Sequence, residues 1–132
     1  MRIKSLVADR RGVSAIEAAI LLPVLILAIV GIAQLAILQF AHAGLRNLIA
    51  EGARFGSISP RPTDAAIKAR LRQGGFGLVP ERVSEPVITY GKAGTADYAD
   101  LELSYTVQLN FLFWNSDVPI KESRRVFIYP ED

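Results

Sequence analysis

Residues 18–33 read AAILLPVLILAIVGIA, which is sixteen consecutive positions without a polar side chain. Gln34 interrupts this apolar run, and residues 35–38 resume it. As an α-helix, the 21 residues of 18–38 would be about 31 Å long at roughly 1.5 Å per residue, which matches a hydrocarbon core of about 30 Å. A chain of 132 residues is too small to cover so long a helix on every side. The sequence therefore predicts a single membrane-spanning helix.

The distribution of charge predicts the orientation of this helix. Residues 1–12 carry a net charge of +3, and the chain after Glu17 holds 11 basic and 11 acidic side chains. Basic residues directly before a spanning helix keep the N-terminus in the cytoplasm. We therefore expect a bacterial inner-membrane protein with a cytoplasmic N-terminus and a periplasmic C-terminal part. The balanced charge elsewhere offers no basic surface for nucleic acid.

Three small or unusual residues lie inside the apolar run. Pro23 removes one backbone donor, so we expect the helix to kink or loosen there. Ala28 and Gly31 leave room for another helix to approach closely, although alanine is common in membrane helices in any case.

The segment RRGVSAIE, residues 10–17, places a carboxylate at the edge of the apolar run. A charge within a membrane helix costs about 2.5–3.5 kcal/mol at the helix centre, and such a residue is a functional candidate. In one interpretation Glu17 only reaches toward the headgroups or favours the helix N-terminus. In the other, the Gly12–Val13 bond is cut and Glu17 neutralises the new ammonium group of Val13, or that of a neighbouring subunit. Gly12 suits a protease that needs close access to the backbone.

This pattern resembles the class III signal of type IV pilin-like proteins, which a membrane prepilin peptidase cuts after the glycine. More narrowly, residues 12–23 (GVSAIEAAILLP) resemble the TadE family, the pseudopilins of the tight-adherence (Flp) pilus. The GARFGS stretch at residues 52–57 is similar to the end of that family's helix. Two departures from major type IV pilins favour the TadE branch: Ala18 follows the glutamate where many pilins have phenylalanine, and Pro23 lies earlier than their proline.

The resemblance implies a minor pilin or pseudopilin that is processed by a prepilin peptidase and contributes to pilus assembly or initiation. Adhesion and surface colonisation would follow from that role. Its partners would be the peptidase, other pilins or pseudopilins of the same machine, and the lipid bilayer. The expected parts are a leader at 1–12, a membrane and assembly helix at 13–40, and a periplasmic or extracellular domain at 41–132.

Two alternatives remain open at this stage. The chain could be an uncleaved single-pass anchor that holds a small periplasmic accessory domain. It could also carry an ordinary signal peptide, because Ala41-His42-Ala43 has the A-x-A form that signal peptidase prefers. The apolar run is longer than the 7–15 residues usual for a removed signal.

The remaining pattern predicts an α+β domain. The helix should continue through residues 41–57 as the spine of the domain, with Leu45, Leu48, Ile49, Gly52 and Phe55 on its apolar side. A second helix is expected at about 64–73, capped by Thr63. Strands are expected near 83–90, at 101–113 and at 124–129, with loops at 91–100 and 112–121. Pro86 predicts an edge position for the first strand. Together they should form a three- or four-stranded antiparallel sheet packed on the spine helix.

The composition excludes most catalytic chemistry. With no cysteine and one histidine, the chain cannot build a thiolate metal site, an iron–sulfur cluster or a multi-histidine site. No phosphate-binding or dinucleotide-binding motif is present. We therefore expect no enzyme activity, no catalytic residue, no cofactor and no metal. Asp97, Asp100 and Glu102 could bring three oxygen ligands together, but a polar strand face explains them better. The aromatic stretch 111–114 could form a contact patch, or serve ordinary packing in the core and at the membrane interface.

Overall fold

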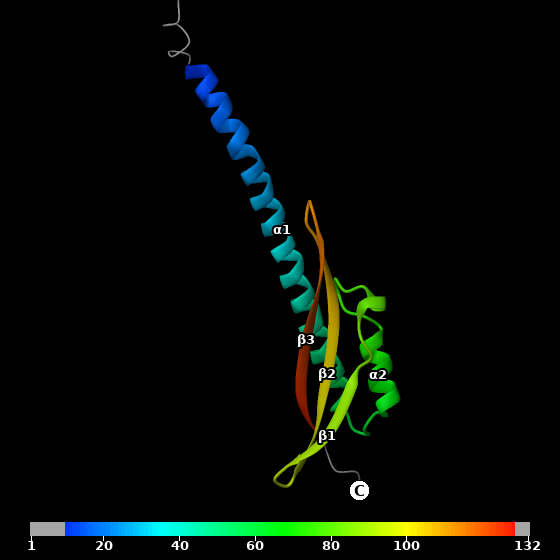
Figure 1. The fold of residues 1–132 in the computed structure, drawn as a ribbon. Coiled ribbons are helices and arrows are strands. Elements are labelled where there is room, and N and C mark those ends of the chain that lie inside the picture. Colours follow the sequence, from blue (N-terminus) through cyan, green and yellow to red (C-terminus); the bar gives the residue numbers. More distant parts are fainter. Residues whose placement is uncertain (1–9, 129–132) are drawn as a thin grey trace, which may run out of the picture.

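The computed structural model describes residues 10–128, with the backbone alone at positions 10–12. Its dominant element is helix α1, Arg10–Gly56, which has 47 residues and is about 70 Å long at roughly 1.5 Å per residue. The N-terminal half of α1 projects away from the rest of the molecule, while its C-terminal half runs alongside the other elements (Figure 1). The prediction that one continuous helix forms both the apolar segment and the spine of the domain is confirmed.

Helix α2, Asp64–Arg72, has the ends that its sequence predicts. The Thr63 hydroxyl oxygen accepts a hydrogen bond from the Ala66 N–H at 3.3 Å, and this satisfies one of the free donors of the first turn. After the helix, Gly74 has a φ of 78°, which favours glycine. Ile67 and Leu71 are the buried residues of α2. A short 3-10 helix, η1 at Pro80–Arg82, leads into the sheet.

The sheet has three antiparallel strands in the order β1-β2-β3. Strand β1 is Val87–Ala93, β2 is Ala96–Asn110 and β3 is Asn115–Ile128. The predicted edge position of the first strand is confirmed, and Pro86 lies directly before it. Pro119 lies in the other edge strand, where a missing backbone donor is tolerated.

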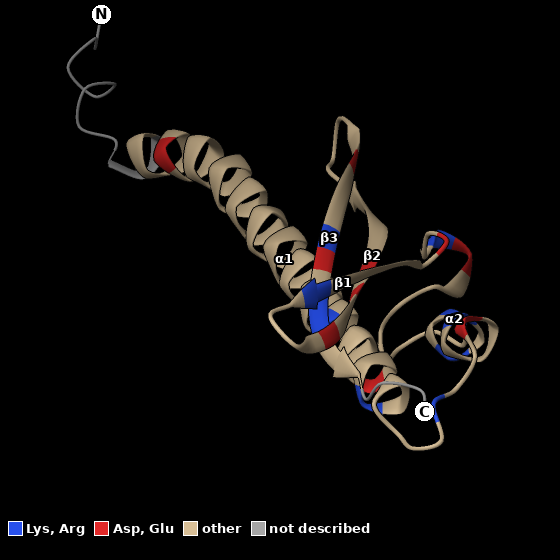
Figure 2. Ribbon diagram, turned by 90° about the horizontal axis from the view of Figure 1, so that it is seen from below, with Lys and Arg blue, Asp and Glu red and all other residues tan. Residues whose placement is uncertain are grey.

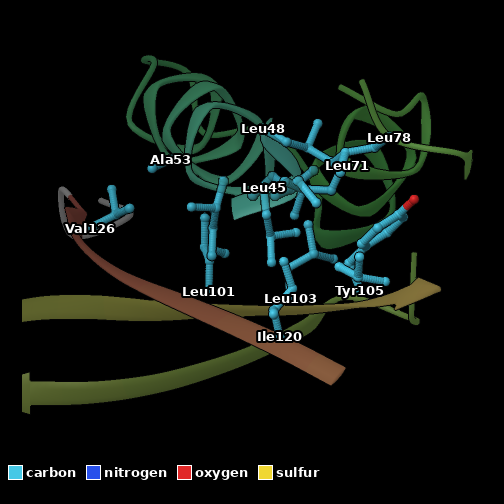
Figure 3. Close-up of a cluster of buried hydrophobic side chains, with 14 of the residues drawn as sticks. Leu45, Leu48, Ala53, Leu71, Leu78, Leu101, Leu103, Tyr105, Ile120 and Val126 are labelled. Atoms are coloured by element: carbon cyan, nitrogen blue, oxygen red, sulfur yellow. The ribbon is translucent and has the colours of Figure 1, made fainter. Parts of the chain in front are cut away.

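The hydrophobic core lies between one face of the sheet and the C-terminal half of α1 (Figure 3). The alternation along β2 directs every second side chain toward α1, as the sequence predicts. These buried β2 residues are Leu101, Leu103, Tyr105, Val107 and Leu109. From α1 they meet residues on one helical face, namely Ala41, Leu45, Leu48, Ile49 and Ala53.

Two predicted loops are instead parts of long strands. Residues 91–100 hold only a two-residue turn, Gly94-Thr95, between β1 and β2. The loop expected at 112–121 is mostly β3, and the turn is limited to positions 111–114. Phe113, the last residue of the strand expected at 101–113, is instead 80% exposed in this turn. Asp97 and Asp100 lie within the loop expected at 91–100, but in β2 they form ion pairs with Lys92 of β1 and Arg125 of β3.

Polar contacts hold α1 against the sheet on its open side. The Arg46 Nε donates to Glu122 Oε1 of β3 at 2.8 Å, and His42 Nε2 lies 3.7 Å from the same oxygen.

A second polar contact joins the sheet to α2. Tyr90 of β1 donates to Asp64 at the start of α2, and Arg61 lies 4.6 Å above the Tyr90 ring. Burial and the Asp64 carboxylate raise the pKa of Tyr90.

Candidate processing and assembly site

The N-terminal half of α1 is mostly exposed. Residues Val13–Gly56 are long and apolar enough to cross a membrane, with a mean hydropathy of 2.8 over the most apolar 18 residues, none of which is buried. In Figure 2 a single acidic band marks the start of α1, and the helix then carries no charge until it passes beneath the sheet. Exposed leucine and isoleucine side chains on all sides of a helix require a lipid or protein environment.

The residues of the proposed cut lie in the first turn of α1. The Gly12–Val13 bond is within the helix, close to its start at Arg10, and the ends of helices fray readily. Val13 is 58% exposed, and Glu17 is also exposed. Positions 13 and 17 are four residues apart, so they share a helical face about 6 Å apart along the axis. A carboxylate at 17 is therefore positioned to reach an ammonium group formed at Val13.

Pro23 lies inside α1 without ending it. Because proline has no N–H, the carbonyl of Ala19 lacks its usual partner in the next turn. Helical structure continues on both sides of this position. The kink at Pro23 stays a prediction.

The two small residues proposed for helix packing leave open space where a larger side chain would lie. Ala28 is exposed, and Gly31 is half-buried, but a Cβ added at Gly31 would meet no atom within 4 Å. Neither residue is needed for close packing within the described chain. Because both residues are small, they leave room for another helix to contact α1 at these positions.

The structure also reveals a contact that the sequence analysis missed. Gln34, the polar residue that interrupts the apolar run, pairs with the backbone of Asn110 at the end of β2. Its Nε2 donates to the Asn110 carbonyl at 2.7 Å, and its Oε1 accepts from the Asn110 N–H at 3.3 Å. The signal was present in the sequence as an isolated amide among apolar residues, which needs a hydrogen-bond partner.

The remaining candidates for chemistry have structural partners. Asp100 and Glu102 face Arg125 and Lys121 of β3, and Asp97 faces Lys92 of β1. Within residues 10–128, no group of three or more acidic or histidine side chains could hold a metal ion. Ala41 is buried in the core, so cleavage after Ala43 would divide α1 inside the folded domain.

An N-terminal helix that is long and apolar enough to cross a membrane serves at its other end as the spine of a small α+β domain. This arrangement fits a membrane-anchored, pilin-like protein. In agreement, residues 12–54 match the model of the family described as TadE-like protein. The match begins at Gly12, covers 43 of the 132 residues and confirms the resemblance to the TadE-like family. Comparison with curated proteins and with solved structures returned no match.

Proposed function

We propose that this chain is a minor pilin or pseudopilin of a tight-adherence (Flp-type) pilus. It is inserted into the inner membrane with its N-terminus in the cytoplasm, and a prepilin peptidase cuts it between Gly12 and Val13. The observation that carries the proposal is the exposed apolar half of α1, which lies within the residues that match the TadE-like family. The chain is a substrate of the peptidase and catalyses no reaction itself.

In this proposal Glu17 is the residue that makes assembly possible. After cleavage it is the fifth residue of the mature chain, one helical turn from the ammonium group of Val13. Inside a membrane or a helix bundle, opposite charges attract far more strongly than in water. Pairing within one chain, or with the next subunit, would neutralise both groups and set the register in which the helices pack.

On assembly, the surroundings of α1 would change from lipid to protein. The apolar side chains of residues 18–38 face lipid before assembly and the helices of other subunits afterwards. Ala28 and Gly31 allow those helices to approach closely. The small domain would remain outside the bundle, because its own core is already complete. Adhesion and surface colonisation would follow from the pilus to which the subunit contributes.

A charge-specific substitution tests this proposal against an uncleaved membrane anchor. Glu17→Gln keeps the size of the side chain and removes its charge, while Glu17→Asp keeps the charge. Removing one partner of a buried ion pair costs about 3–5 kcal/mol, so we expect the assembled fraction of Glu17→Gln to fall on the order of 100-fold. Assembly is measured as the share of the chain recovered in sheared surface fibres or in detergent-resistant complexes.

Glu17→Asp is the matched control and should retain part of the assembly. The mature mass of each variant is measured first, so that a failure of cleavage is distinguished from a failure of assembly. Cleaved Glu17→Gln that assembles like the parent chain would show that Glu17 has no pairing role. Equal behaviour of all three chains, uncleaved and unassembled, would identify a plain anchor.

A further inference from the structure

The turn between β2 and β3 is an exposed apolar tip, formed by Phe111-Leu112-Phe113-Trp114. Its last three side chains are 55%, 80% and 59% exposed, in sequence order. The tip is nevertheless closed by its own contacts. The Phe111 N–H donates to the Trp114 carbonyl at 2.8 Å, and the two rings stack with centroids 4.8 Å apart. Three exposed large apolar side chains in one closed turn are typical of a surface that contacts a partner or a membrane, while Phe111 packs against the core.

The position of this tip relative to α1 is fixed by Gln34. Both backbone groups of Asn110, the last residue of β2, bond to the Gln34 amide. The hairpin points toward the N-terminal end of α1, and its tip reaches the level of the exposed half of that helix (Figure 1) while standing apart from it (Figure 2). The residues of α1 that become half-buried in this region are Val30, Gly31, Gln34 and Leu38.

If α1 crosses a bilayer, the place of Gln34 along the helix gives the depth of the tip in the membrane. Gln34 lies four residues before Leu38, the end of the apolar run, which corresponds to about 6 Å along the helix axis. Amphipathic segments at a membrane surface bury their apolar face by about 5–10 Å. The tip extends beyond Asn110, and so reaches at least the depth at which such segments lie.

The chemistry of the hairpin agrees with this depth. No charged side chain occurs in residues 103–116. The first carboxylate after the tip is Asp117, three residues from Trp114 and about 10 Å away at roughly 3.3 Å per strand residue. Tryptophan and other aromatic residues concentrate at the membrane–water interface, where a ring can meet both lipid and headgroups. A second exposed aromatic residue, Phe76, packs on Phe40 of α1 just beyond the apolar run, with ring centroids 5.4 Å apart.

We propose that the β2–β3 tip inserts into the outer interface of the bilayer that α1 crosses. The domain would then hold the membrane at two points, α1 and the tip, with the Gln34–Asn110 pair joining them. The side-chain amide of Gln34 would then have the Asn110 backbone as its hydrogen-bond partner at a depth where water is scarce. This inference rests on the part of the proposed function that places α1 in the membrane, but it requires neither cleavage nor pilus assembly.

Trp114 is the only tryptophan of the chain, so its fluorescence reports directly on the tip. The experiment uses the full chain in vesicles of phosphatidylethanolamine and phosphatidylglycerol that carry a quencher at a shallow or a deep acyl position. We expect blue-shifted emission, protection from aqueous iodide, and stronger quenching by the shallow label than by the deep one. The matched control is Trp114→Phe combined with Phe127→Trp, because Phe127 is also 59% exposed but lies in the last part of β3, far from the tip. That control should be quenched by iodide and by neither lipid label.

Flotation of the same vesicles after an alkaline wash separates the two claims. Failure of the chain to float would contradict the placement of α1 in the membrane. A chain that floats while its Trp114 is quenched by iodide and not by lipid would overturn the insertion of the tip alone. Protection from iodide without quenching by either lipid label would show that protein covers the tip, and would also overturn the proposal.

Discussion

At the scale of single residues, opposite charges on the outer face of the sheet allow acidic residues to occupy β2. Arg125 donates two hydrogen bonds to the Asp100 carboxylate, both at 2.8 Å, and its guanidinium lies 3.9 Å above the Tyr98 ring. The hydrogen bonds from Arg125 lower the pKa of Asp100 below its usual range. The charged form of Asp100 is thus favoured by folding.

This pairing predicts a small dependence of stability on pH. A carboxyl group whose pKa is lower in the folded chain stabilises the fold above its unfolded pKa, and this contribution is lost as the pH falls through its folded pKa. We therefore expect Asp100→Asn to unfold at lower urea concentration than the parent chain at neutral pH. The two midpoints should converge in acid. Equal midpoints at neutral pH would show that solvent screening cancels the interaction.

At the scale of elements, the segment between α2 and η1 packs closely on α1. A Cβ added at Gly44 would lie 2.7 Å from the backbone oxygen of Phe76, which cannot move without displacing that segment. At Gly31, in contrast, an added Cβ meets nothing within 4 Å. These two glycines of α1 therefore differ, because Gly44 is closely packed within the domain and Gly31 leaves open space beside the helix.

This difference gives a matched pair of substitutions. Gly44→Ala should destabilise the domain by about 1–3 kcal/mol, the usual cost of overpacking. Gly31→Ala should leave the unfolding midpoint of the domain unchanged. Urea unfolding of the full chain in detergent micelles, followed by the circular dichroism of the sheet, measures both. A Gly44→Ala chain as stable as the parent would show that the segment at Phe76 is not held against α1.

The helical elements were predictable from sequence because their signals are local. The apolar run, the Thr63 cap and the apolar face at Leu45, Leu48 and Ile49 all act within a few residues along the chain. The strand ends were not predictable in the same way. Asp97 and Asp100 resemble loop residues until Lys92 and Arg125 are placed opposite them, and those partners are defined only by the strand register.

The candidate site likewise contains some features that the sequence predicts and others that it does not. Gly12, Val13 and Glu17 were predicted from the basic leader, the carboxylate at the edge of the apolar run and the resemblance to the TadE family, and their roles stay predictions. The pairing of Gln34 with Asn110 could not be predicted, because it joins residues 76 positions apart in the sequence. The exposed tip was visible only as an aromatic stretch, and its location at the level of the exposed half of α1 follows from the fold of the hairpin.

At the scale of the whole molecule, the C-terminal half of α1 belongs to a domain with its own hydrophobic core, whereas the N-terminal half lies outside that core. The sheet, α2 and the C-terminal half of α1 enclose one hydrophobic core. The N-terminal half of α1 is apolar and mostly exposed, and the residues that match the TadE-like family begin at Gly12. In the proposed function, this helix holds the protein in the membrane and later packs into the pilus after the leader is removed.

The most direct test of this account is the N-terminus of the protein in native membranes. Intact mass and N-terminal sequencing are measured in cells with and without their prepilin peptidase. The account predicts a chain that begins at Val13 when the peptidase is present, and an uncut precursor when it is absent. An intact N-terminus near Met1 in both strains would contradict processing and favour a plain membrane anchor. A start at Gly44 would show that signal peptidase cuts after Ala43, and would contradict the pilin-like account as a whole.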